Sequence, residues 1–181
     1  MIKTFITGCY FLLLSSKVST GPPQSTSITI ERDLFEEAVA LIKEYEGWHS
    51  SHFPYIGYGH RLTSGETFNP EISKLTADSL LRNDLRKKCA VFRNFGKDSL
   101  LLGVLSYNVG EYNLLGYGRR PKSVLIRKLE TGDRNIEKEY MSFRRANGKV
   151  LPSLERRRKA EFNLLFNKIK KNIQLKLENN D

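Results

Sequence analysis

The sequence predicts a mostly helical α+β domain with one small sheet, a β-hairpin. Three observations support this fold class. Apolar residues recur at helical spacing along much of the chain, and residues 100–105 are apolar on every side, as in a helix at the centre of a bundle. Residues 56–62 instead alternate with a period of two, which is typical of a strand, and Ser64-Gly65 turns the chain. A length of 181 residues fits one domain with a single buried core.

The helices are predicted as follows. The first spans residues 31–45, because its apolar residues form one stripe and acidic residues occupy its first turn. Thr76 is the expected N-cap of a second helix that continues to about Phe92. The central apolar helix should end at Asn108-Val109-Gly110. Three more helices are expected at residues 123–129, 136–145 and 153–177.

Glu46 is the acid around which a site is expected. It ends the first helical pattern, and Gly47 stops that pattern at once because glycine accepts a left-handed conformation. The predicted hairpin follows nine positions later, at Tyr55. A carboxylic acid held by a rigid helix beside a glycine-rich hairpin indicates a cleft, and we expect neighbouring Tyr45 and Trp48 to give the acid an apolar surrounding.

The N-terminus predicts export. Lys3 precedes a short apolar run that is too short to cross a bilayer and is typical of a secretory signal. We expect residues 1–20 to be a signal peptide, residues 21–30 a linker and residues 31–181 the folded domain. A buried N-terminal helix is the alternative. Export would place the protein in the periplasm or cell envelope.

The net charge of +10 lies entirely in the last third of the chain. Residues 1–118 hold 12 basic and 12 acidic side chains, whereas residues 119–181 hold 18 basic and 8 acidic ones. Such a surface predicts an anionic partner, and the run from Arg156 to Lys159 is expected to form a solvated face. Cys89 would be the one cysteine left after export, expected in the core, so no disulfide framework, metal site or cofactor is predicted.

Glu46-Gly47 followed by Tyr55-Ile56-Gly57-Tyr58-Gly59-His60 resembles the phage-type lysozymes (glycoside hydrolase family 24, endolysin-like). The similarity continues through Ser106–Gly110, Ser123–Asp133 and Gly148–Glu161, so it covers roughly residues 34–166. It implies a lysozyme-like fold whose hairpin lines an active-site cleft. The chain departs from the family by lacking the aspartate between acid and hairpin, and by having Tyr55 where the family has threonine.

The resemblance implies a muramidase that hydrolyses the β-1,4 bond between N-acetylmuramic acid and N-acetylglucosamine, with Glu46 as the catalytic acid. His49 and His52 lie where the family's aspartate would be, and we expect one of them to orient the attacking water. His60 is expected to be structural. The residues expected to bind substrate are Tyr55, Tyr58, Asn108 and Glu66. Glu66 is also a less favoured candidate for a second catalytic carboxylate.

Three alternatives to hydrolysis stay open. A lytic transglycosylase needs only Glu46, because the sugar's own hydroxyl attacks. A protein that binds the cell wall without cutting it would depend on the basic C-terminal third. A nucleic-acid binder is favoured by charge but by no motif, so we expect peptidoglycan and anionic wall polymers as partners, no nucleic acid, and a monomer.

Overall fold

The computed structural model describes residues 24–50, 53–67 and 71–168, with side chains from residue 33 onward. It is mostly helical with two small antiparallel hairpins, which confirms the predicted fold class and adds one hairpin to it. The helices are α1 Gln24–Glu46, α2 Lys74–Val91, η1 Arg93–Asp98, α3 Ser99–Val109, α4 Tyr112–Leu115, α5 Val124–Glu130, α6 Glu137–Met141, α7 Pro152–Phe162 and η2 Asn163–Asn167. The strands are β1 Tyr55–Ile56, β2 His60–Arg61, β3 Arg145–Ala146 and β4 Lys149–Val150.

Helix α3 is the centre of the molecule, as its apolar sequence predicts. Residues 101–106 are all buried, and α3 packs on α1, α2 and α7. Gly110 ends the helix, at the predicted position, with φ of 78°. Gly103 lets α2 come close, because a Cβ there would lie 2.6 Å from Cys89 Sγ.

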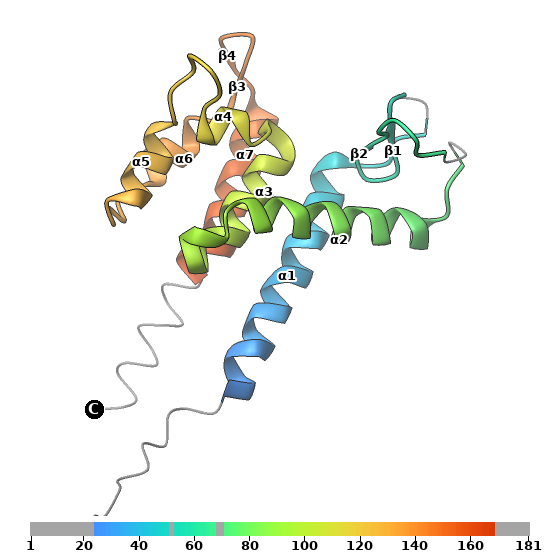
Figure 1. Ribbon diagram of the computed structural model, residues 1–181, viewed down its shortest axis with the longest axis horizontal. Helices are drawn as coiled ribbons and strands as arrows, with labels where there is room; N and C mark the ends of the chain where they lie inside the picture. The colour runs from blue at the N-terminus through green and yellow to red at the C-terminus, as the bar shows by residue number, and fades with distance from the viewer. Residues whose placement is uncertain (1–23, 51–52, 68–70, 169–181) are drawn as a thin grey trace, which may run out of the picture.

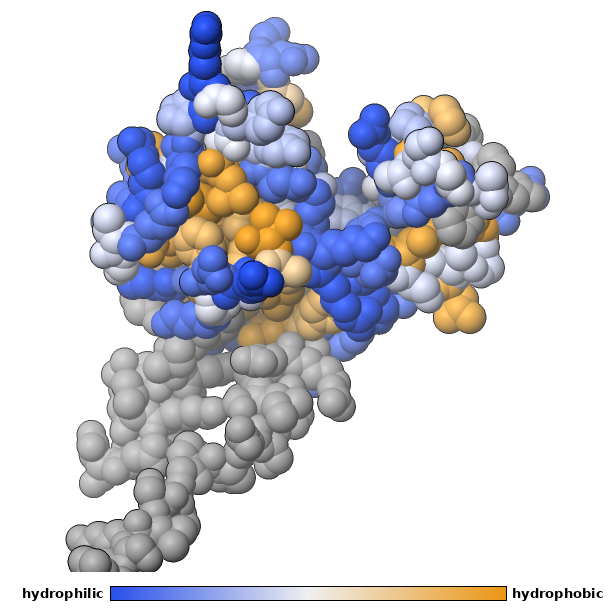
Figure 2. Space-filling view, viewed as in Figure 1, coloured by the Kyte–Doolittle hydropathy of each residue, from blue (hydrophilic) through white to orange (hydrophobic). Residues whose placement is uncertain are grey.

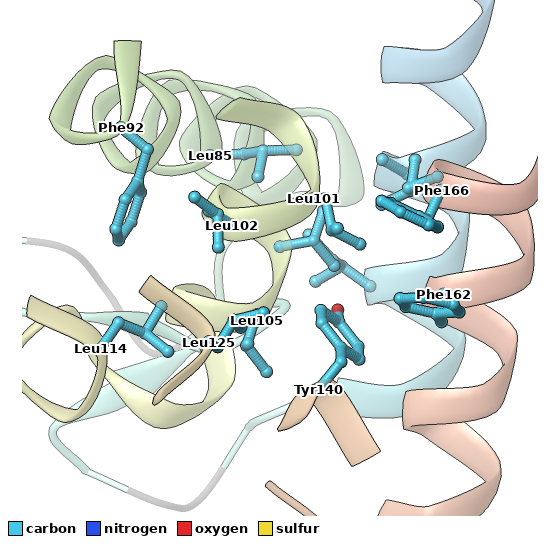
Figure 3. Packing of buried hydrophobic residues seen from close by; sticks show 14 of the residues in the cluster. Leu85, Phe92, Leu101, Leu102, Leu105, Leu114, Leu125, Tyr140, Phe162 and Phe166 are labelled. Carbon is cyan, nitrogen blue, oxygen red and sulfur yellow. The ribbon is translucent and has the colours of Figure 1, made fainter. Parts of the chain in front are cut away.

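The main core lies between α1, α2, α3, α5, α6, α7 and η2 (Figure 3). Phe162 and Phe166 stack, with ring centroids 4.6 Å apart, and Tyr140 packs against Phe162. Burying an aliphatic or phenylalanine side chain of this kind contributes about 1.5–3 kcal/mol each. Leu85, Leu101, Leu102, Leu105 and Leu125 complete the layer that Figure 3 shows around these rings.

The elements fall into two groups joined by α2 (Figure 1). One group contains α3 to α7 and the β3–β4 hairpin; the other is the β1–β2 hairpin at the far end of α2. The space-filling view shows a notch between the two groups, and α1 ends at its base (Figures 1 and 2). The last residue of α1 is Glu46, so the fold places this acid between the two groups.

Two helices begin at other residues than predicted. Helix α1 begins at Gln24, so residues 24–30 of the expected linker are helical. Extending a formed helix adds one hydrogen bond for each residue fixed, and no Gly or Pro follows Pro23 in this stretch. The N-cap of α2 is Ser73 rather than Thr76, because Ser73 Oγ accepts the Thr76 N–H at 3.0 Å.

The predicted helix 136–145 is wrong at its C-terminal end. Helix α6 stops at Met141, and residues 145–150 form the second hairpin instead. Asn147 and Gly148 both have positive φ, at 51° and 76°, which is the backbone that a tight hairpin turn requires. Helix α4 and the 3₁₀ segment η1 were not expected from the pattern.

No described helix is long and apolar enough to span a membrane. The predicted signal peptide, residues 1–20, and the end of the predicted last helix, residues 169–177, lie outside the described residues.

Candidate active site

Glu46 is held at the last position of α1. Gly47 follows with φ of 68°, and its N–H still bonds to the Lys43 carbonyl at 3.1 Å, so the helix ends in an ordered turn. The Glu46 side chain is 18% exposed. The acid is therefore half-buried and fixed on a rigid element, as expected from the sequence.

Arg157 of α7 contacts the acid directly. Its Nη1 donates to Glu46 Oε1 at 2.8 Å, although the two residues are 111 positions apart in the chain. The Arg157 guanidinium also lies 5.7 Å from the centre of the Tyr45 ring. The expected apolar surrounding of Glu46 is thus wrong, because a buried cation occupies one side of the carboxylate.

A second buried carboxylate, Glu161, holds that cation in place. Glu161 Oε1 accepts from Arg157 Nε at 2.8 Å and from Arg158 Nη2 at 3.0 Å, and its Oε2 accepts from the Tyr140 hydroxyl at 2.8 Å. Arg157, Arg158 and Glu161 are at most 3% exposed. Buried charges of this kind persist only when they are paired and hydrogen-bonded.

The network is electrically balanced, with two guanidiniums facing the carboxylates Glu46 and Glu161. Burial acts to lower the pKa of Arg157, but the charges of Glu161 and Glu46 hold it above its ordinary value. For Arg158 burial prevails against the charge of Glu161, and its pKa is lowered. Burial and the charge of Glu161 raise the pKa of Tyr140, so its hydroxyl remains a donor.

The β1–β2 hairpin approaches Glu46 through a glycine. A Cβ on Gly59, whose φ is 88°, would lie 3.5 Å from Glu46 Oε2, the oxygen that faces away from Arg157's bond. Gly57 contacts the start of α2 so closely that a Cβ would be 2.7 Å from the Ala77 Cβ. Gly57 is therefore needed for the close approach to α2, whereas Gly59 is at ordinary contact distance from Glu46 and is favoured by its positive φ.

Two contacts anchor the hairpin to the helices. The Tyr107 hydroxyl of α3 donates to the Tyr58 carbonyl at 2.9 Å. The buried His60 ring bonds through Nδ1 to Asp84 Oδ2 of α2 at 2.6 Å. His60 therefore has the structural role that the sequence predicts.

Glu66 is tied to its own turn. Its Oε2 accepts from the Thr63 N–H at 2.8 Å and from the Thr63 hydroxyl at 2.7 Å, and lies 3.4 Å from His60 Nε2. These hydrogen bonds from Thr63, with the nearby His60, lower the pKa of Glu66. No contact between Glu66 and Glu46 occurs in the part of the chain that the structure describes, so its expected substrate and catalytic roles stay predictions.

His49 pairs with the β1–β2 hairpin through its backbone. Its N–H and carbonyl pair with Gly57, at 2.7 and 3.1 Å, and its ring centre lies 6.3 Å from that of Tyr55. Its predicted partner in catalysis, His52, lies outside the described residues. Neither the catalytic role of His49 nor that of His52 is tested by this geometry.

The other predicted substrate residues lie on the β1–β2 hairpin and at the end of α3. Tyr55 is partly exposed on β1, and the Tyr58 ring packs edge-on against Trp48, with centroids 5.3 Å apart. Asn108 lies at the end of α3, where its Oδ1 accepts from Arg158 Nη2 at 3.1 Å. The Glu161 network thus reaches Asn108 through Arg158.

The expected solvated face at Arg156–Lys159 is half wrong, since Arg157 and Arg158 are among the most buried side chains of the molecule. These arginines, Glu161 and Tyr140 were missed as site residues. One signal was available: Arg158 and Glu161 continue the apolar stripe of Leu154 and Leu165 at spacings of four, three and four. Charges on a buried stripe predict an internal ion network.

No group of His, Cys, Asp or Glu within the described ranges is arranged to hold a metal ion. The described site consists of the Glu46 carboxylate at the notch, the Arg157 guanidinium bonded to its Oε1, and Gly59 beside its Oε2.

Comparison with known proteins agrees with this geometry. The family model "Phage lysozyme" matches residues 43–161, which contain Glu46, the hairpin and the Arg157–Glu161 pair. The solved muramidase domain of SpmX from Asticaccaulis excentricus is 27% identical, with a TM-score of 0.56 over 72% of this chain and 95% of that one. The active form of the P1 phage endolysin Lyz shares the fold at 17% identity, with a TM-score of 0.60 over 82% of this chain and 96% of that one. No curated protein sequence matches. Because the family model covers well over half of the residues, the chain belongs to the phage lysozyme family.

Proposed function

We propose that this protein is a peptidoglycan-degrading glycosidase of the lysozyme type, with Glu46 as its general acid. Membership of the phage lysozyme family supports the lysozyme-like function. One observation supports the assignment of the acid: Glu46 ends α1 at the notch with one oxygen bonded to Arg157 and the other facing Gly59.

The proposed reaction is hydrolysis of the β-1,4 bond between N-acetylmuramic acid and N-acetylglucosamine. Glu46 protonates the glycosidic oxygen, the bond to the anomeric carbon breaks, and a water adds to that carbon. Since Oε1 accepts from Arg157, the transferable proton belongs on Oε2, the oxygen beside Gly59. Glu161 keeps Arg157 in place while Glu46 changes charge.

A second candidate, a lytic transglycosylase, is favoured by one observation. The connection from Gly47 to Pro54 contains no Asp or Glu where the family has its aspartate, and Glu66 is bonded to Thr63. An inverting hydrolase needs a base about 6.5–9.5 Å from the acid, whereas a transglycosylase uses the substrate's own hydroxyl. His49, His52 and Glu66 are the candidates for that base if the reaction is hydrolysis.

The test compares Glu46→Gln with Glu44→Gln on purified cell-wall sacculi. Glu44 is exposed on the same helix, two residues earlier, so it is a matched control. We expect Glu46→Gln to lower the rate of wall solubilisation by about 10²-fold or more, because general acid catalysis contributes that much. The control should keep the parent rate, and circular dichroism should show both variants folded.

Product masses separate the reactions. Reducing ends support hydrolysis, and anhydro ends, one water lighter, support transglycosylation. A Glu46→Gln variant that solubilises walls as fast as the parent contradicts the assignment of the acid. A parent protein that binds sacculi and releases no products would be a wall-binding member of the family.

We also propose that the protein acts in the periplasm or cell envelope after export. The support is the apolar run behind Lys3. We expect the mature chain to begin between Ser16 and Ser27, and cleavage before Gln24 would leave α1 intact. N-terminal sequencing of protein from the envelope fraction tests this, and a chain that still begins at Met1 rejects it.

A further inference from the structure

Two tyrosines form an exposed aromatic surface outside the site. Tyr112 on α4 is 58% exposed and Tyr117, in the loop after α4, is 72% exposed. Their ring centroids are only 4.9 Å apart, with the planes tilted by 51°. Single exposed aromatic residues are common, but two that contact each other while facing solvent form a continuous platform.

The loop that carries Tyr117 is a tight turn closed by backbone hydrogen bonds. Tyr117 and Arg120 exchange backbone hydrogen bonds of 3.1 and 2.9 Å across the turn. The chain then returns so closely past Gly116 that a Cβ there would lie 2.4 Å from the Arg120 carbonyl oxygen. Gly116 has φ of 79°, which favours glycine, so the turn is fixed by its backbone rather than by side chains.

The same turn presents positive charge. Arg119 and Arg120 are both exposed, and neither makes an ion pair or a cation–π contact with any residue that the structure describes. Nearby Lys122, in contrast, is paired with Glu130 at 2.6 Å. The two arginines therefore keep their charge and their hydrogen-bond donors available for a partner.

We propose that Tyr112, Tyr117, Arg119 and Arg120, here called the Tyr–Arg surface, bind an acidic polysaccharide strand. The apolar faces of pyranose rings pack on tyrosine rings, whose hydroxyls remain solvated. Carboxylate or phosphate substituents of the strand pair with the guanidiniums, which suit both groups through bidentate hydrogen bonds.

The location of the Tyr–Arg surface supports a strand that also reaches the site. Helix α4 begins two residues after Gly110, the C-cap of α3, and the end of α3 carries Asn108. The loop after α4 lies at the same end of the helical group as the β3–β4 hairpin (Figure 1). The choice of cell-wall glycan as the polysaccharide rests on the proposed function. The preference for a sugar polymer with anionic substituents rests only on the exposed tyrosines and arginines.

The experiment measures binding of the full chain to purified sacculi in a Glu46→Gln background, so that the wall is not digested during the assay. We expect Tyr112→Ala/Tyr117→Ala to weaken binding by about tenfold or more, the equivalent of roughly 1.4 kcal/mol. Tyr112→Phe/Tyr117→Phe should retain binding, because the rings remain. Arg119→Gln/Arg120→Gln should weaken binding and reduce its sensitivity to salt.

The matched control is Lys74→Ala/Leu75→Ala, which removes an exposed cation and an exposed apolar side chain from the start of α2. It should bind like the parent. Thermal unfolding of every variant should match the parent, since these side chains are exposed. Unchanged sacculus binding of Tyr112→Ala/Tyr117→Ala overturns the proposal. The same variant losing affinity for single-stranded DNA but not for sacculi overturns it in favour of a nucleic-acid surface.

These outcomes are distinct from failure of the proposed function, which is measured by the lytic rate of the parent against Glu46→Gln. A parent with no lytic activity but Tyr–Arg-dependent sacculus binding would retain the surface and reject the enzyme. An active parent whose binding ignores the Tyr–Arg surface would retain the enzyme and reject the surface.

Discussion

Replacing Glu161 with glutamine removes the charge that holds Arg157 against Glu46. Glu161 is 1% exposed and accepts three hydrogen bonds, from Arg157, Arg158 and Tyr140. Glutamine keeps the size but leaves two buried guanidiniums with Glu46 as their one remaining counter-charge in the network. Removing one partner of a buried ion pair costs about 3–5 kcal/mol, because the other charge stays buried without compensation.

The assay is thermal and urea unfolding of the parent, Glu161→Gln and the control Glu155→Gln. Glu155 is on the same helix, but its ion pairs with Arg144 and Lys159 are exposed to solvent, so the control should unfold close to the parent. At about 2–4 °C per kcal/mol for a chain of this size, Glu161→Gln should melt about 6–20 °C lower.

Lytic activity should fall as well in Glu161→Gln, at temperatures where the variant is folded, because Arg157 is released from its position behind Glu46. Glu161→Leu would not serve as a control, because it removes the carboxylate partner of Arg158 and leaves Arg157 with Glu46 alone. If Glu161→Gln and Glu155→Gln lower the unfolding free energy by the same small amount, the buried network does not stabilise the fold as argued.

Three smaller predictions concern close packing and burial. Gly103→Ala should lower the free energy of unfolding by about 1–3 kcal/mol, because the new Cβ would lie 2.6 Å from Cys89 Sγ. Adding Cys89→Ala should recover part of this loss, and no recovery would show that this contact is not the cause. Gly116→Ala should lower the free energy of unfolding by about as much, since its Cβ would lie 2.4 Å from the Arg120 carbonyl oxygen. Gly132→Ala is the control: φ is positive there too but the Cβ would meet open space, so only the backbone strain should lower the free energy of unfolding. Burial raises the pKa of the Cys89 thiol to about 11, so alkylation at pH 8 should be much slower in the native protein than in urea; equal rates would refute the burial. The thiol of the unfolded chain ionises at lower pH than the buried one, so the free energy of unfolding should decline between about pH 8.5 and pH 11.

The sequence predicted the parts of the fold that local signals determine. The stop of α1 at Glu46-Gly47, the hairpin at residues 55–61 and the end of α3 at Gly110 follow from glycine positions and from the change between helical and strand periods. The prediction was wrong where one signal has two meanings. Asn147-Gly148 was interpreted as the end of a helix, although the same pair is the strongest short signal for a hairpin.

The position of Glu46 at a helix end beside the hairpin was predictable, but its environment was not. Glu46 was identified from its place between a helix end and a hairpin, which are neighbours in sequence. Arg157 reaches it from 111 positions away, and such a contact leaves no trace in local periodicity. The mistake about Arg157 and Arg158 came from treating a run of four basic residues as one surface, although a helix turns successive residues to different faces.

The basic charge of the last third therefore divides into two parts with different consequences. Arg157 and Arg158 are buried and balanced by Glu46 and Glu161, so their charge does not attract a wall polymer; it holds the acid. In the proposed mechanism Glu46 must be protonated before it acts, and this removes one of the two negative charges in the balance. The catalytically competent form is thus less well compensated than the resting form, a cost that active sites commonly carry against stability. Binding to an anionic wall polymer, as proposed, would depend instead on exposed cations such as Arg119 and Arg120, which lie outside the network.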